Sequence, residues 1–274
     1  MSAPQPLLNG LVLGESPRWH DNRLWFADWG TGEIVATDRA GKREVILNVA
    51  SFPFSFDFLP TGHMLVVHTK DRVLLRRAPD GARDVHADLG AHADTRWHKL
   101  VVDGRGRAFV NGSDLSALVT PDGSLRTVAT GLRSPNGMAV TPDNATLIVA
   151  ERSARRLSAF EIADDGTLHN RRVWAPVDGK PAGICLDADG AVWAAVGRRC
   201  VRVREGGAVL DALVLDAECF ACTLGGADND TLFMLTTHWL GRERVDSMGR
   251  AGKVFTASTD SLRLARVDAV RCAA

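Results

Sequence analysis

Short apolar runs alternate with polar turns along the whole chain, and one arrangement of them occurs six times. Each copy has an apolar run, a turn of Gly, Asp, Asn or Pro, and a second run rich in Leu, Val, Trp and Phe. Runs of this length between turn residues are typical of β-strands. The copies follow one another at intervals of about 40 residues, and six such repeats predict an all-β fold, a six-bladed β-propeller.

Two further strands are expected after each pair, which gives four-stranded antiparallel blades. Residues 33–37 and 125–129 are examples of an expected third and fourth strand. Residues 7–13 look like the fourth strand of a blade that lacks its first three, so we expect this N-terminal strand to complete the last blade and remove an open sheet edge. Residues 262–270 compete for that place. The whole chain, residues 1–274, is expected to be one domain.

Composition excludes several classes of function. The 33 basic residues balance the 33 acidic residues, and the predicted pI is near 7.1, so neither a nucleic-acid groove nor an anionic membrane surface is indicated. The N-terminal residues lack the basic and apolar regions of an export signal, and no run approaches the roughly 18 apolar residues of a membrane helix. We therefore expect a cytoplasmic protein with no membrane and no nucleic-acid partner, whose ligand is a small molecule.

The repeat also predicts where the site lies. The first strand of each propeller blade begins beside the central channel, so the equivalent position of each repeat is expected to contribute to one ring. That ring consists of Glu15, Ser55, His98, Asn136, Ala182 and Ala221. Glu15 and Asn136 offer hard oxygen ligands that suit Ca²⁺, Mn²⁺ or Mg²⁺, and His98 shifts the preference toward Zn²⁺ or Fe²⁺. Without a metal, Glu15 and His98 can act as acid and base.

The direction of the strands sorts the remaining polar residues onto two faces. Second strands return to the ring face, so the residues at their ends should flank the site. His68, Asn111, Glu151 and His238 at these ends, together with Ser55 of the ring, are candidates for substrate binding. Residues 238–252 form the longest loop on this face and are either a lid or an irregular loop. The turns that contain Asp187 and Asp189 fall on the opposite face, where such residues usually cap their own backbone.

Three stretches resemble a known family. GESPRW from Gly14, SPNGMAVTPD from Ser134 and PAGICLDADGAVW from Pro181 are similar to motifs of the senescence-marker protein/gluconolactonase/luciferin-regenerating family, over about residues 7–258. The resemblance implies a six-bladed propeller with a divalent metal in its central channel. It also implies hydrolysis, because many members hydrolyse sugar lactones and relatives hydrolyse esters or organophosphates.

The family's site residues match this chain only in part. The resemblance makes Glu15 and Asn136 metal ligands, but Ala182 stands where the family has an aspartate ligand and proposed general base. The family's Asn-Asp pair is replaced by His98 and Lys99. Arg96 stands where members often have an arginine that contacts the substrate, and the neighbouring Trp97 is a candidate for lining the pocket.

Lys99 leaves three interpretations open. The first is that it pairs with Glu15 in place of the metal. The second is that it acts as a base or amine nucleophile, and the third is that it points toward solvent at the blade rim.

Three functions remain open in turn. One is a lactone or ester hydrolase in which Glu15, Asn136 and His98 hold a divalent ion, with His98 or His68 accepting the proton. Another is a metal-independent isomerase, cyclase or lyase that uses Glu15, His98 and Lys99. The last is a non-catalytic binding protein for a small molecule.

Overall fold

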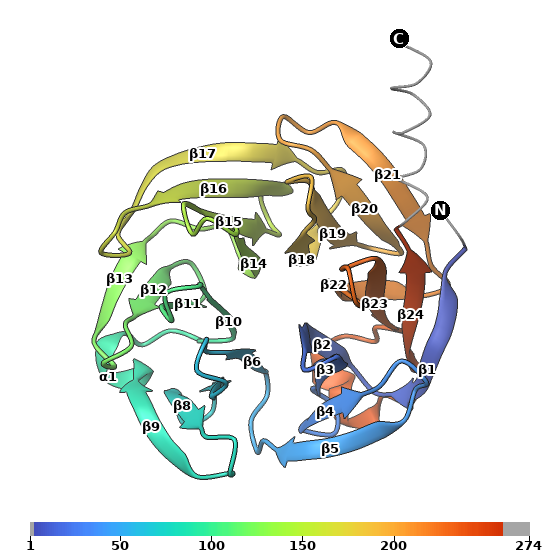
Figure 1. Ribbon diagram of the computed structural model, residues 1–274, viewed down its shortest axis with the longest axis horizontal. Coiled ribbons are helices and arrows are strands. Elements are labelled where there is room, and N and C mark those ends of the chain that lie inside the picture. Colours follow the sequence, from blue (N-terminus) through green and yellow to red (C-terminus); the bar gives the residue numbers. More distant parts are fainter. Residues whose placement is uncertain (1–2, 260–274) are drawn as a thin grey trace.

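The computed structural model describes residues 3–259, and their strands form six four-stranded antiparallel sheets arranged in a ring (Figure 1). In five of the sheets the four strands follow one another in chain order, as in β6-β7-β8-β9. The first strand of each blade lies nearest the centre of the ring and the fourth lies at its rim. The predicted six-bladed β-propeller is thereby confirmed.

The blades follow one another around the ring in chain order (Figure 1). Blade one contains β2 (Gly14–His20), β3 (Arg23–Asp28), β4 (Glu33–Thr37) and β5 (Arg43–Asn48). Blade two contains β6 (Phe54–Phe58), β7 (Met64–His68), β8 (Val73–Arg77) and β9 (Arg83–Asp88). Blade three contains β10 (Lys99–Val102), β11 (Ala108–Asn111), β12 (Ser116–Val119) and β13 (Leu125–Ala129). Blade four contains β14 (Pro135–Val140), β15 (Thr146–Glu151), β16 (Arg156–Ile162) and β17 (Leu168–Pro176). Blade five contains β18 (Pro181–Leu186), β19 (Val192–Val196), β20 (Arg199–Val203) and β21 (Val209–Val214). Blade six contains β22 (Glu218–Gly225), β23 (Thr231–Thr237), β24 (Gly252–Ser258) and β1 (Gln5–Leu11).

The hydrophobic core consists of clusters between neighbouring blades. Every residue of β7 and of β19 is buried, because each of these second strands packs against a blade on both faces. This explains why the second apolar run of each repeat is nearly continuous rather than alternating. The fourth strands at the rim, such as β21, are largely exposed. Burying both faces of the inner strands therefore fixes the blades around the channel.

The N-terminal strand closes the ring. β1 pairs antiparallel with β24, from Gln5 opposite Thr256 to Leu11 opposite Gly252, and so forms the outer strand of the last blade. The two chain ends are thus joined in one sheet, as the sequence predicted for residues 7–13. The competing segment 262–270 lies outside the described residues.

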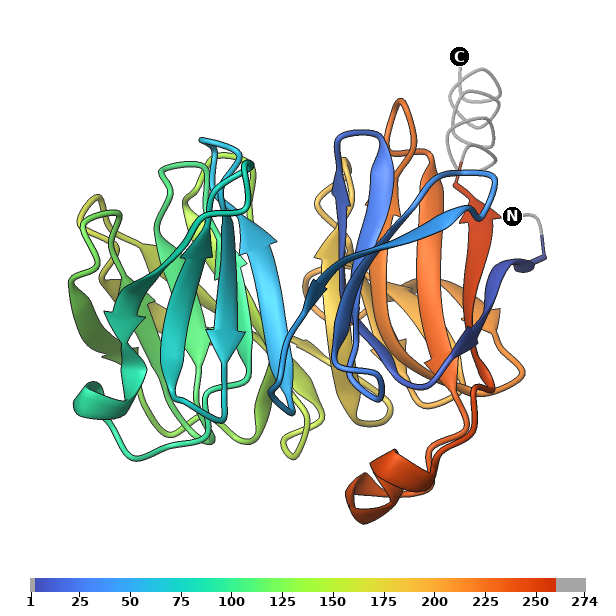
Figure 2. The ribbon, with the colours of Figure 1, turned by 90° about the horizontal axis from the view of Figure 1, so that it is seen from below.

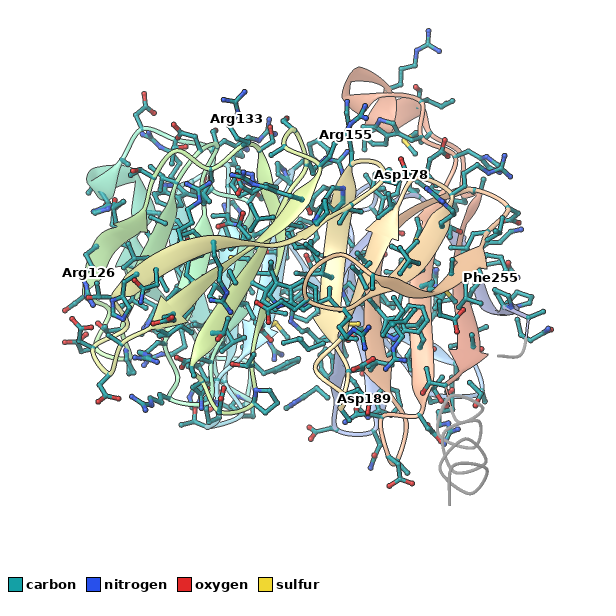
Figure 3. All side chains as sticks on the ribbon, turned by 90° about the horizontal axis from the view of Figure 1, so that it is seen from above. Arg126, Arg133, Arg155, Asp178, Asp189 and Phe255 are labelled. Carbon is teal, nitrogen blue, oxygen red and sulfur yellow. The ribbon has the colours of Figure 1, made fainter. Side chains whose placement is uncertain are left out.

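The two faces of the ring differ. Among the described residues the helices are a four-residue α1 (Leu89–His92) and the 3₁₀ helix η1 (Arg242–Ser247), and neither is long enough to cross a membrane. η1 projects from one face of the ring (Figure 2). Arg133, Arg155 and Asp178 lie on that face, whereas Asp189 lies on the opposite one (Figure 3). The site residues are therefore expected on the face that carries η1.

Candidate functional site

A cavity of about 770 Å³ opens on the η1 face and leads into the central channel. Four of the six predicted ring residues line it: Glu15, His98, Asn136 and Ala182. Aromatic residues from different blades form much of the remaining wall: Trp29, Phe52, Phe220 and Trp239. The cavity has the size and the mixed apolar and polar lining of a small-molecule site.

Glu15, which lines this cavity, forms an ion pair with Lys99, which lines a separate small cavity of about 20 Å³ on the other side of Glu15. Lys99 Nζ lies 2.5 Å from Glu15 Oε2, and the two side chains are 6% and 2% exposed. The ammonium also donates to Ser16 Oγ at 3.3 Å and lies 4.8 Å from the ring centre of Trp29, which adds a cation–π contact. Burial lowers the pKa of Lys99 below its ordinary value, and the charge of Glu15 and its hydrogen bond offset only part of this shift. Of the three interpretations of Lys99, the structure therefore shows the pair with Glu15.

The backbone at Ser16 holds this arrangement in a strained conformation. Ser16 has a φ of 50°, in the left-handed region, and lies within an irregularity of the β2–β3 pairing between Glu15 and Arg18. Its N–H donates to Glu15 Oε2 at 2.9 Å, and its side chain is buried. A buried non-glycine residue in this region costs free energy, and such residues are concentrated at functional sites.

Lys99, rather than His98, occupies the ring position of blade three. In blade two, Phe58 and Met64 are the last opposed residues before the turn between the first two strands, and Ser55 lies three residues before Phe58. In blade three the equivalent residues are Val102 and Ala108, and Lys99 lies three residues before Val102. In β14 and β18 an extra residue bulges between the channel end and the turn, so the ring position lies one residue earlier there. β10 has no such bulge. By strand register Lys99 is therefore the equivalent of Ser55, while His98, the predicted ring residue, lies one residue earlier and lines the cavity.

His98 lies at the wall of the cavity, one residue before β10. Its Nδ1 is 3.0 Å from the carbonyl oxygen of Arg96 and its Nε2 is 3.0 Å from that of Pro135. Burial and then the charge of Lys99 lower the pKa of His98 to about 4, against the favourable carbonyl of Pro135. His98 is therefore neutral near pH 7. Both ring nitrogens face carbonyl oxygens, an arrangement that does not suit a metal ligand.

The amide oxygen of Asn136 is buried and accepts no hydrogen bond from any described residue. Asn111 fixes the backbone of Asn136, because its Nδ2 donates to the Asn136 carbonyl oxygen at 3.0 Å. Ser55 Oγ and Asn111 Oδ1 are also buried without a described partner, but neither residue lines the cavity. Asn136 thus supplies a free acceptor to the cavity, while Asn111 holds it in place.

Basic side chains surround the mouth of the cavity. Arg96 lines it, as predicted, and donates from its guanidinium to the carbonyl oxygen of Phe52 at 3.3 Å. Arg152, which the sequence reasoning missed, lines it as well, and its charge lowers the pKa of Lys99. Arg152 directly follows Glu151 at the end of a second strand, so its position in the repeat was the signal that could have identified it.

Two predicted substrate-binding residues are built into the fold instead. Trp97 is fully buried in the cluster between blades two and three and donates from Nε1 to the Leu89 carbonyl oxygen at 3.0 Å. Glu151 is fully buried and accepts hydrogen bonds from Arg156, Arg171, Ser158 and the backbone N–H of Arg133. Neither side chain lines the cavity. Trp97 is packed in the core, and the Glu151 carboxylate is engaged by its own ion pairs.

The remaining predicted residues lie beside the cavity rather than in its wall. His68 Nδ1 lies 3.2 Å from a carboxylate oxygen of Asp71, and His238 is exposed at the end of β23. The neighbouring Trp239 does line the cavity. Val245 and Met248, in the predicted lid segment 238–252, pack against Val12 and Leu13. The loop is therefore anchored at the mouth of the channel.

Asp187 and Asp189 belong to the opposite face, as predicted. The Asp187 carboxylate accepts from the backbone N–H groups of Asp189 and Ala191, and both aspartates pair with Arg202. They are turn and ion-pair residues remote from the cavity.

A divalent metal, which the family resemblance implies, does not fit the residues present. Glu15 and Asn136 provide two oxygen donors in one cavity, but Ala182 contributes none. Within residues 3–259, no group of three or more acidic, histidine or cysteine side chains is placed to hold a metal. The Lys99 ammonium lies on the carboxylate, and a 2+ ion about 4 Å from it would be repelled by roughly 8 kcal/mol at an effective dielectric constant of about 20. The chemistry of the site is therefore derived from the side chains alone.

Comparison with known proteins gives a consistent picture. A family model described as the SMP-30/Gluconolactonase/LRE-like region matches residues 13–238. The pentonolactonase XacC of Haloferax volcanii is 28% identical over 244 residues, which cover 82% of this chain and 81% of the relative.

Solved structures share the architecture. A gluconolactonase from Xanthomonas campestris superimposes with a TM-score of 0.76 at 23% identity, covering 91% of this chain and 88% of the other. A calcium-binding protein, regucalcin, from Agrobacterium tumefaciens superimposes with a TM-score of 0.75 at 17% identity, covering 93% and 92%. At these identities the two structures support the fold alone.

Proposed function

Because this chain belongs to the SMP-30/gluconolactonase/LRE-like family, we propose that it hydrolyses small lactones in the cavity on the propeller axis. The observation that carries the proposal is that a buried carboxylate, Glu15, and a residue with an unpartnered amide oxygen, Asn136, line the same cavity. The names of the relatives favour lactones of five- and six-carbon sugar acids as first candidates.

Glu15 is the proposed general base. It removes a proton from a water molecule as that water attacks the lactone carbonyl, and a bond forms between the water oxygen and the carbonyl carbon. The ring C–O bond then breaks, and the departing alkoxide takes the proton back from Glu15. The product is the open hydroxy acid, so one water is consumed and no other reactant is needed.

The other side chains position and stabilise. Lys99 supplies the charge that a buried carboxylate needs and fixes its orientation together with the Ser16 N–H. Asn136 Oδ1 accepts a hydrogen bond from a substrate hydroxyl. Arg152 donates to the oxyanion that develops when the carbonyl is attacked, which is the kind of interaction that contributes most to such reactions.

The test is steady-state hydrolysis of a panel of sugar-acid lactones by the wild-type protein and Glu15→Gln. We expect kcat/KM to fall by about 10²–10⁴-fold in the variant. Glu205→Gln is the matched control, because Glu205 is exposed and pairs with Arg172 away from the cavity. Since Glu15→Gln leaves Lys99 unpaired, Glu15→Gln/Lys99→Met is measured as well, and a folded double variant with wild-type turnover would refute the role of Glu15.

A second candidate is an isomerase or lyase that uses the same pair. The observation in its favour is a buried lysine amine next to a carboxylate and an aromatic wall. A Schiff-base version forms a covalent imine between Lys99 and a carbonyl substrate, with loss of water. Reduction with borohydride and mass spectrometry of the Lys99 peptide would detect it, and the lactonase proposal predicts no adduct.

A further inference from the structure

We propose that the Lys99 ammonium is a resident replacement for a divalent cation, so that this channel carries out its chemistry with a cation supplied by the chain itself. The inference rests on the proposed function for the reaction, lactone hydrolysis. The replacement of the cation is argued from the geometry around Glu15 alone.

The ammonium lies directly on the one carboxylate of the ring. Lys99 Nζ is 2.5 Å from Oε2 of Glu15, a residue that lines the cavity together with Asn136. A metal ion bound to the other oxygen, Oε1, would share a single negative charge with the ammonium. The ammonium and a metal ion therefore compete for the charge of Glu15.

Three different groups surround the ammonium. Ser16 Oγ accepts from Lys99, and the ring of Trp29 lies beneath the charge at 4.8 Å. Ser16 is held in the left-handed region while its N–H binds the other partner of the pair, Glu15. A hydroxyl, a carboxylate oxygen and an aromatic face therefore contact one amine, as in a site built for a monovalent cation.

Position 182 provides no side-chain ligand for a metal ion. Ala182 lines the same cavity as Glu15 and Asn136 and is buried, but its methyl group offers no donor. With one carboxylate and one ammonium the pair is neutral. A carboxylate at position 182 together with a neutral residue at 99 would give two carboxylates and one amide oxygen, which is a donor set that suits Ca²⁺ or Mn²⁺.

The experiment uses two substitutions to convert the site that holds the ammonium into a site that binds a metal ion. Wild-type protein, Lys99→Met/Ala182→Asp and the control Lys253→Met are titrated with CaCl₂ and MnCl₂ by calorimetry. Terbium luminescence sensitised by Trp29, which lines the cavity, gives a second readout. Lys253 is the matched lysine, because its Nζ also lies 2.5 Å from a carboxylate, that of Asp216, but in an exposed pair.

We expect no saturable binding to the wild type or the control, and at least a 100-fold gain in affinity in the double variant, to about the 10⁻⁴–10⁻³ M range of weak sites or tighter. Lactone turnover by the wild type should be unchanged in excess EDTA. Binding of one equivalent of Ca²⁺ or Mn²⁺ by the wild type, abolished in Glu15→Gln, would overturn the proposal. A folded double variant that binds no better than the wild type would overturn it as well.

The wild-type titration decides the matter by itself if the double variant does not fold without a metal, and a variant that folds only when CaCl₂ is added supports the proposal. Metal binding is measured without substrate. A chain that binds no metal and hydrolyses no lactone would therefore refute the proposed function while leaving this inference intact.

Discussion

A double-mutant cycle at Glu15 and Lys99 tests the central observation. Breaking a buried ion pair from one side leaves an uncompensated charge and costs about 3–5 kcal/mol. Both Glu15→Gln and Lys99→Met should therefore lower the free energy of unfolding by that amount, because the two side chains are 2% and 6% exposed. Replacing both removes both charges, and such neutral replacements are often tolerated, so we expect the double variant to cost less than about 2 kcal/mol.

The chain contains its own control for this cycle. Lys253 and Asp216 lie at the same Nζ–O distance of 2.5 Å, but their side chains are 35% and 48% exposed. Exposed pairs contribute at most about 1 kcal/mol, so the cycle of Lys253→Met and Asp216→Asn should show almost no coupling. The two pairs differ in burial while their geometry is matched.

Urea unfolding followed by tryptophan fluorescence measures all variants of both cycles. In thermal unfolding, a loss of 3–5 kcal/mol corresponds to roughly 6–20 °C for a chain of this size. A coupling energy at Glu15–Lys99 that is as small as the coupling at Lys253–Asp216 would show that the pair is not desolvated, and the reasoning above would be refuted.

Four further outcomes follow from the same contacts. The pKa of His98 is lowered to about 4 in the folded protein, so the unfolded chain takes up its proton first and stability falls by up to about 3 kcal/mol between pH 6.5 and 4. Measured by urea unfolding, the free energy of unfolding of His98→Gln should depend less on pH across this range than that of the wild type. An equal pH dependence in the two proteins would contradict the prediction. Glu151→Gln should cost about 3–5 kcal/mol without changing the kcat/KM of the folded protein, and reduced turnover would restore a substrate role. Arg152→Gln should lower kcat by about 10²–10³-fold with a smaller change in KM, and an unchanged kcat would exclude the oxyanion role. Deleting residues 1–11 should expose the edge of β24 and give aggregates in gel filtration, whereas a stable monomer would show that β1 is dispensable.

The architecture was predictable because it repeats. Six copies of one pattern determine the number of blades, and residues 7–13 revealed the closure because they match a fourth strand without its first three. The order of the sheet, β1-β24-β23-β22, confirms that interpretation. Strand direction also placed Asp187 and Asp189 on the face away from the site, where they pair with Arg202.

The ring was harder to predict, because a single bulged residue moves every side chain beyond it. β14 and β18 each contain an extra residue near the channel, whereas β6 and β10 do not. Counting back from the turn with the spacing of β14 selects His98, and counting with that of β6 selects Lys99. Bulges depend on how neighbouring blades pack and leave no clear mark in a single sequence.

Glu151 shows a different limit. Its place at the end of a second strand predicted exposure to the site, but three donors from neighbouring strands and one from the backbone bind its carboxylate. Part of this was visible in the sequence, because Glu151 and Arg156 face each other across one short turn. The contact with Arg171 depends on the register of a third strand, which the sequence pattern alone does not give.

Of the three departures from the family pattern, at positions 98, 99 and 182, those at 99 and 182 change the charge around Glu15 and are considered together. The resemblance places an aspartate at position 182, and a 2+ ion between that aspartate and Glu15 forms a neutral group. Here Ala182 removes one negative charge and Lys99 replaces two positive charges by one, so the buried group is neutral again. Either change alone leaves one net charge in a place where a side chain is about 2–6% exposed, which is strongly unfavourable. Neutrality of the buried group in this chain therefore links positions 99 and 182, although they lie on different blades: with Lys99 paired to Glu15, an aspartate at 182 would add an uncompensated negative charge.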